Sequence, residues 1–117
     1  MKTYSIAALA ALSLALVGAG TAAARDSAAQ TTTIRVKATD FKFRLSTRTV
    51  MHGRITFVIQ NAGSAEHNFR IAGHTSKTIG SGKTTRLTVM LKRGRYPYKC
   101  AVDSHAELGM KGVLRVT

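Results

Sequence analysis

The chain has 117 residues and carries 18 lysines and arginines against five aspartates and glutamates, a formal net charge of +13. This length favours one domain, and a single cysteine excludes an intramolecular disulfide. A basic chain first suggests a nucleic-acid partner, but the Lys and Arg residues are scattered evenly with few aromatic residues between them. An apolar leader, which indicates export, also argues against nucleic acid. The charge therefore indicates either a solvated basic surface or attraction to an acidic partner.

The first 24 residues have the composition of a secretory signal peptide. Lys2 supplies a positive start, an apolar run extends from Ile6 to Val17, and Ala22 to Ala24 offer a small-residue cleavage site. Since a transmembrane helix needs about 20 apolar residues, we expect cleavage and export, for instance to the periplasm, with an uncleaved anchor as the alternative. The expected organisation is a signal peptide at 1–24, a flexible polar leader at 25–33 and one domain at 34–117.

Beyond the leader, apolar and polar residues alternate as in strands with one buried face. The alternation changes parity across Thr39 and Asp40, which predicts a bulge or bend where a strand crosses from one sheet to the other. His52 and Gly53 indicate a turn, and no segment after the leader shows a helical period. The pattern predicts an antiparallel β-sandwich of about seven to eight strands. The expected inward-facing residues are Ile34, Val36, Ala38, Phe41, Phe43, Leu45, Ile55, Phe57, Ile59, Leu87, Val89, Leu91, Tyr96, Tyr98, Leu114 and Val116.

His67 follows a turn-forming segment, Asn61 to Ser64, and shares the face of Phe69 and Ile71. At the beginning of that strand, its side chain is expected to point into the end of the domain. A lone histidine on an apolar face is usually a core residue with a hydrogen-bond partner. A cysteine further along the chain makes metal ligation the stronger interpretation.

The strongest chemical signal lies near the end of the chain, where Cys100, His105 and Met110 follow one another at intervals of five residues. A thiolate, an imidazole and a thioether together suit copper, and a blue-copper centre adds a second histidine, which His67 can supply. A free thiol in an exported protein is open to oxidation, and metal ligation would protect Cys100. The alternative is a buried structural cysteine.

The Cys-x4-His-x4-Met motif ends a tyrosine-rich strand and resembles the C-terminal signature of the cupredoxins, the plastocyanin- and azurin-like blue-copper proteins. The segment from Asn61 to Phe69 resembles the family's loop with the first histidine ligand. Over Ile34 to Thr117 the resemblance implies a cupredoxin-like Greek-key β-sandwich with one type 1 copper ion. It implies that His67, Cys100 and His105 are strong ligands, that Met110 is the axial ligand, and that Asn68 ties the two ligand loops together.

The resemblance further implies a monomeric carrier of single electrons between redox proteins, and not an enzyme. Copper delivery or homeostasis with the same fold is the alternative, and a basic adhesion module is a third hypothesis. By resemblance, electrons would pass through an apolar patch around His105 with Lys111 on its rim, which favours an acidic partner. His52 is expected in a turn, and His74 either at the surface or in a secondary copper site.

Overall fold

The computed structural model describes Thr3 and residues 31–117. Apart from Thr3, the expected signal peptide and residues 25–30 of the expected leader lie outside the described residues. Within the described part of the chain, no helix is long and apolar enough to cross a membrane.

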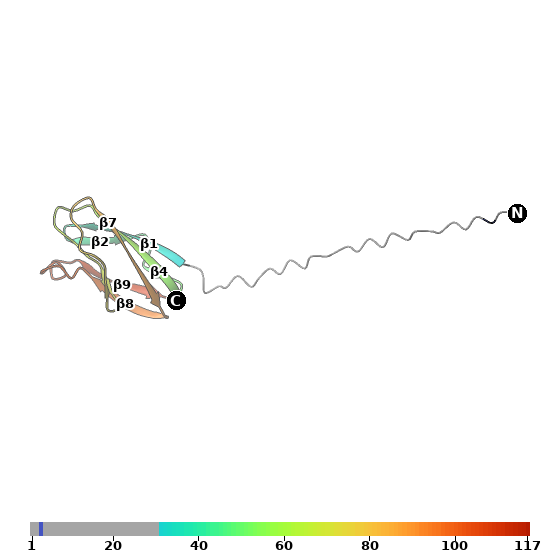
Figure 1. Cartoon of the computed structure of the whole chain (residues 1–117). Helices are drawn as coiled ribbons and strands as arrows, with labels where there is room; N and C mark the ends of the chain where they lie inside the picture. Colours follow the sequence, from blue (N-terminus) through green and yellow to red (C-terminus); the bar gives the residue numbers. More distant parts are fainter. Residues whose placement is uncertain (1–2, 4–30) are drawn as a thin grey trace.

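Residues 31–117 form two packed sheets (Figure 1). The first has the strand order β2-β1-β4-β7 and the second the order β3-β9-β8-β5-β6. The predicted β-sandwich is therefore confirmed. The described part has nine strands, more than the expected seven to eight, because three have only two residues. The strands are β1 (Thr31–Thr39), β2 (Lys42–Leu45), β3 (Thr49–Val50), β4 (Gly53–Asn61), β5 (Arg70–Ile71), β6 (His74–Thr75), β7 (Thr84–Leu91), β8 (Gly94–Lys99) and β9 (Lys111–Val116).

Two strand pairs are parallel, so the expectation of a wholly antiparallel sandwich was wrong. β1 runs parallel to β4, and β3 runs parallel to β9. Between β1 and β4 the chain forms β2 beside β1, crosses to the other sheet as β3, and returns on the far side of β1. That excursion lets β4 enter in the same direction as β1. Alternation alone shows which face of a strand is buried, not which strand lies beside it.

The parity change at Asp40 has a different cause from the one predicted. β1 and β2 form an antiparallel hairpin within one sheet, with Thr39 opposite Lys42 and Ala38 opposite Phe43. Paired residues of a hairpin lie on the same face, so a two-residue loop reverses the parity without any change of sheet. The chain crosses to the other sheet later, between β2 and β3.

β1 begins three residues before the expected domain boundary at Ile34. Thr31 to Thr33 pair with Arg54 to Thr56 of β4. Residues 31–33 of the expected leader therefore take part in the sheet.

The hydrophobic core lies between the two sheets. Its central aromatic residue is Phe69, two residues after His67. The ring centroid of Phe69 lies 4.9 Å from that of Phe57 and 5.4 Å from that of Tyr98. Phe69 is fully buried, so the segment entering β5 is held between the sheets. His67, two residues earlier, is thereby fixed at one end of the sandwich. The loop between β8 and β9 lies at the end of the molecule opposite the C-terminus (Figure 1).

Candidate metal centre

His67, Cys100 and His105 meet at one end of the sandwich. Cys100 Sγ lies 3.9 Å from His67 Nδ1 and 3.7 Å from His105 Nδ1. Each can offer a ligand atom, and the three atoms lie within 4.8 Å of one another. The relative exposure is 0% for His67, 1% for Cys100 and 8% for His105. The fold thus brings together donors that are 33 residues apart in sequence.

The spacing of these atoms fits a single metal ion. Metal–sulfur and metal–nitrogen bonds of about 2.3 and 2.0 Å, as zinc makes them, place the donors roughly 3.7 Å apart when they meet at about 120°. The observed sulfur–nitrogen distances of 3.7 and 3.9 Å agree with that value. A thiolate with two imidazoles is a donor set that suits copper.

Met110 is fully buried. Its side chain packs in a small cluster with Ala38 and Cys100. The Cys100 N–H donates to the Met110 carbonyl oxygen at 3.0 Å, and the Met110 N–H donates to the His105 carbonyl oxygen at 3.2 Å. The thioether therefore belongs to the same buried end of the domain as Cys100.

The loop between β8 and β9, residues 100–110, is called the ligand loop below because it contains three candidate ligands. It is a compact series of turns held by its own backbone hydrogen bonds. The His105 N–H donates to the Val102 carbonyl oxygen at 3.1 Å, and the Leu108 N–H donates to that of His105 at 3.1 Å. Gly109 has a φ of +115°, a conformation open to glycine and strained for other residues. The loop therefore fixes His105 and Met110 relative to Cys100.

Asn68 connects the two loops that supply the candidate ligands. Its Oδ1 accepts a hydrogen bond of 2.7 Å from the Ala101 N–H, directly after Cys100. Its Nδ2 donates to Thr78 Oγ1 at 3.1 Å. The first of these hydrogen bonds joins the residue after His67 to the residue after Cys100.

Asp40, in the turn between β1 and β2, is a site residue that sequence reasoning missed. Its Oδ1 lies 2.8 Å from His67 Nε2. The carboxylate also accepts hydrogen bonds from the Ser64 N–H at 2.9 Å and the Ala65 N–H at 3.2 Å. The Ser64 N–H, then His67 and the Ala65 N–H, lower the pKa of Asp40 below its usual range. The carboxylate is therefore ionised at neutral pH.

The ionised carboxylate determines which nitrogen of His67 carries the proton. A hydrogen on Nε2 is held by Asp40, which leaves the Nδ1 lone pair directed at Cys100 and available to a metal. Close approach is possible because residue 63 is glycine, since a Cβ at that position would overlap the Asp40 carboxylate. No local sequence signal marks Asp40, which reaches His67 across 27 residues through the hairpin.

Phe41 covers the other histidine. Its ring centroid lies 4.8 Å from that of His105 and 6.2 Å from that of His67. The two turn residues of one hairpin thus contact both candidate histidine ligands, Asp40 by a hydrogen bond and Phe41 by packing.

The other histidines lie away from this cluster. His52 lies at the bend before β4, as expected, with its Nδ1 2.9 Å from the Thr117 carbonyl oxygen. His74 is exposed in β6. Within residues 31–117, a group of three possible metal ligands is found at His67, Cys100 and His105 and not around His74.

The family model of the cupredoxin-like domain matches residues 7–116, so the chain belongs to the cupredoxin-like family. The family and the fold class predicted from the sequence are thereby confirmed. A comparison with curated proteins finds no match.

Solved structures of auracyanins share the fold. Reduced auracyanin from Roseiflexus castenholzii is 19% identical, with a TM-score of 0.64 over 74% of this chain and 97% of that chain. Auracyanin A from Chloroflexus aurantiacus, described as a "blue" copper protein, is 19% identical, with a TM-score of 0.64 over 75% of this chain and 100% of that chain. Auracyanin B is 18% identical, with a TM-score of 0.64 over 76% and 89% of the two chains.

Proposed function

We propose that this chain is an exported type 1 copper protein that carries single electrons between redox partners. The observation that supports it best is the convergence of one donor atom each from His67, Cys100 and His105 within 4.8 Å in a buried cluster. These three residues would hold one copper ion, and the thioether of Met110 would supply a fourth, weaker donor. The description of auracyanin A as a blue copper protein supports the same role for a chain of the same fold.

Bound copper supplies the one-electron change between its two oxidation states. The chain's own residues hold the donors in place during that change. Asp40 keeps the proton of His67 on Nε2, and Asn68 keeps the Cys100 loop against the His67 loop. Because burial excludes water and both loops are hydrogen-bonded, the donors move little when an electron arrives or leaves. Because the donors rearrange little, the site suits an electron carrier better than an enzyme, which needs an open coordination position for its substrate.

The apolar leader supports the proposed export of the protein. Residues 1–24 act as a signal peptide that is removed on export to the periplasm or beyond, and the mature protein is a monomer without a nucleic-acid partner. Mass spectrometry of the exported protein should give a chain that begins at Arg25. A chain that keeps Met1 to Ala24 would indicate an anchor instead.

Copper delivery is the alternative for the same fold and donor set, and retention of copper separates the two. The copper-loaded protein should pass through repeated reduction and oxidation at an electrode with full recovery of its signal, even with a copper(I) chelator in the buffer. Buried, hydrogen-bonded donors release copper slowly, which a carrier requires. Quantitative transfer of copper to the chelator after one reduction would support delivery and contradict the carrier.

A further inference from the structure

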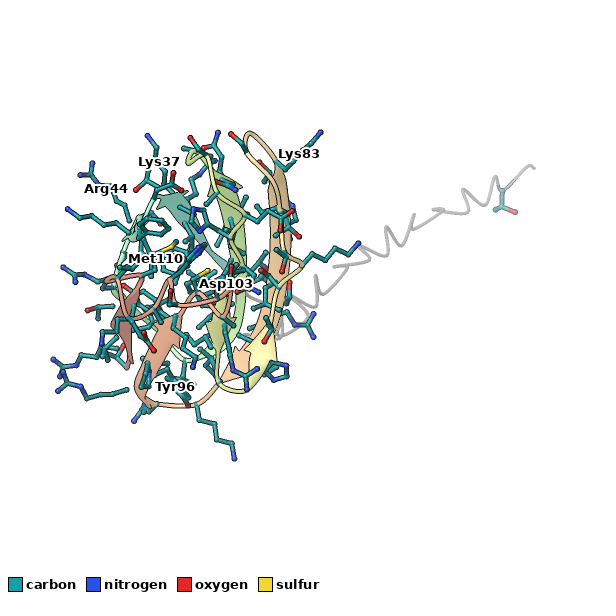
Figure 2. All side chains as sticks on the ribbon, turned by 90° about the vertical axis from the view of Figure 1, so that its left-hand side faces the viewer. Lys37, Arg44, Lys83, Tyr96, Asp103 and Met110 are labelled. Atoms are coloured by element: carbon teal, nitrogen blue, oxygen red, sulfur yellow. The ribbon has the colours of Figure 1, made fainter. Side chains whose placement is uncertain are left out.

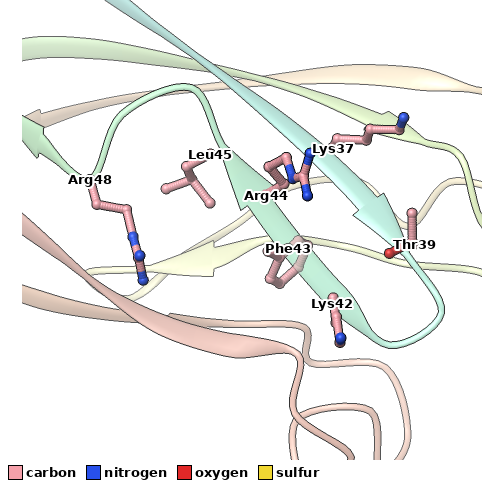
Figure 3. Close-up of a pocket in the computed structure, with 7 residues that line it drawn as sticks. All are labelled: Lys37, Thr39, Lys42, Phe43, Arg44, Leu45 and Arg48. Carbon is pink, nitrogen blue, oxygen red and sulfur yellow. The ribbon is translucent and has the colours of Figure 1, made fainter.

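The hairpin that contacts both candidate histidine ligands also forms one wall of a groove. The groove follows β2, which is the edge strand of its sheet, and encloses about 490 Å³ (Figure 3). Phe43 and Leu45, both half-buried, are among its lining residues and project from the inner face of β2. Four cationic residues also line it: Lys37, Lys42 and Arg44 project from the opposite face of the hairpin, and Arg48 follows β2.

No carboxylate lines this groove, and its cations are close to one another. Lys37 lies directly opposite Arg44 across β1 and β2. Like charges at paired positions of a sheet repel each other, so this arrangement is unfavourable in the free protein. Over residues 31–117 the recorded ion pair joins His67 to Asp40, and the groove cations have no carboxylate partner. An anionic ligand would therefore relieve repulsion as well as supply attraction.

The carboxylates lie elsewhere, close to the metal centre. Asp103 and Glu107 belong to the ligand loop, and Glu66 immediately precedes His67. Figure 2 looks onto this end of the molecule, with Met110 and Asp103 near the middle of the view and Lys37 and Arg44 projecting at one flank. A carboxylate-rich surface approaching the metal end directly would be repelled by the loop carboxylates and attracted by the flank.

We propose that the groove along β2 is the docking site for the acidic face of a redox protein partner. Carboxylate side chains would pair with Lys37, Lys42, Arg44 and Arg48, and apolar atoms that reach around the edge strand β2 would cover Phe43 and Leu45. The hairpin then connects the docked partner to the metal centre, because Phe41 packs against His105 at a centroid distance of 4.8 Å. Only the redox nature of the partner rests on the proposed function; the charge and shape of the groove do not.

The test uses the whole chain under reducing conditions and a synthetic decapeptide of aspartate and glutamate as the probe. Backbone amide NMR shifts should change along β2 and the end of β1. The double variant Lys37→Gln/Arg44→Gln should weaken peptide binding about tenfold at low salt, because both charges face the groove. The matched control Arg93→Gln/Arg95→Gln removes two exposed charges near the end opposite the metal centre, one in the turn before β8 and one in β8, and should weaken binding less than about twofold.

Equal weakening by the two double variants, or shifts spread over the whole basic surface, would overturn the proposal in favour of net charge alone. Binding of anionic lipid vesicles or duplex DNA through Lys37 and Arg44, more tightly than the peptide, would also overturn it.

Copper binding is measured separately on the same variants and should match that of the unaltered chain. A chain that fails to bind copper but still binds the peptide in the groove would contradict the proposed function and leave the docking site standing.

Discussion

At the scale of single residues, the candidate metal centre depends on two side chains that are not themselves candidate ligands. Asp40 holds Nε2 of His67 at 2.8 Å, and Asn68 accepts from the Ala101 N–H at 2.7 Å. The sequence motif predicts the donors, because Cys100, His105 and Met110 are close in sequence and chemically matched. It does not predict Asp40, whose contact exists only once the hairpin has formed its register.

Replacing the Asp40 carboxylate should weaken copper binding. Asp40→Asn keeps the size of the side chain but removes the charge that holds the His67 proton, so copper affinity should fall by about 10- to 100-fold. A competition titration against a chelator measures this. Asp103→Asn is the matched control, since Asp103 is exposed on the ligand loop at a φ of +42°, which asparagine tolerates. Equal losses of copper affinity in the two variants would mean that Asp40 acts only through the net charge of the protein and not through His67.

The same carboxylate should make the stability of the metal-free protein depend on pH. Its hydrogen bonds lower the pKa of Asp40 in the folded state. The ionised carboxylate therefore stabilises the fold fully above its unfolded-state pKa of about 3.9, and this contribution is lost as the pH falls through the lowered folded pKa. Urea unfolding at pH 2.5 to 6 should show a gap between the unaltered chain and Asp40→Asn that closes toward acid pH. A gap independent of pH would contradict this.

Removing the Asn68 side chain should loosen the contact between the ligand loops. Asn68→Ala leaves the Ala101 N–H without its acceptor and should lower the free energy of unfolding by about 1–2 kcal/mol, measured by urea unfolding. Thr78→Val removes only the second bond of Asn68, to an exposed hydroxyl, and should cost less. A larger loss from Thr78→Val than from Asn68→Ala would mean that the link to Ala101 is not the important one.

At the scale of elements, strand faces could be predicted and strand neighbours could not. Every residue expected to face inward on β4 is buried: Ile55, Phe57 and Ile59. The hairpin of β1 and β2 was mistaken for a crossing between sheets, because a two-residue turn and a bulge both reverse the parity of the pattern. The parallel pairing of β1 with β4 depends on contacts between distant segments, which alternation does not record.

The pairing of β8 with β9 gives an element-level prediction. Gly112 lies opposite Tyr98, and a Cβ at that position would overlap the buried Tyr98 phenol. Gly112→Ala should therefore lower the free energy of unfolding by about 1–3 kcal/mol, as overpacking does. Gly80→Ala is the control, because a Cβ there meets open space, and it should be neutral or slightly stabilising. Thermal unfolding of both variants measures the difference, and equal stability would contradict the tight fit at Tyr98.

At the scale of the whole molecule, the sandwich holds the candidate donors through the chain's own hydrogen bonds. The donors converge through backbone hydrogen bonds of the loop between β8 and β9 and through the links of Asp40 and Asn68. Charge is distributed unevenly on this scaffold: the described carboxylates lie in the loops of the metal end, and lysines and arginines extend along the strands. The net charge of +13 predicted attraction to acidic partners but not this segregation.

A site that is held by the chain's own hydrogen bonds should survive removal of the metal. The metal-free protein should keep its sheets and unfold cooperatively. Copper should raise the melting temperature, because a ligand at 100 times its dissociation constant adds about 2.7 kcal/mol. Circular dichroism melts with and without copper measure both effects. A metal-free chain without sheet structure would contradict a scaffold that forms the site by itself.

The visible absorption spectrum tests the central claim most directly. One equivalent of copper(II) added to the purified protein should produce an intense thiolate-to-copper charge-transfer band and a blue colour, since Cys100 and two histidines form the donor set of a type 1 centre. Cys100→Ser should abolish the band. A colourless protein that nevertheless binds copper, or a band that survives Cys100→Ser, would contradict a type 1 centre at His67, Cys100 and His105.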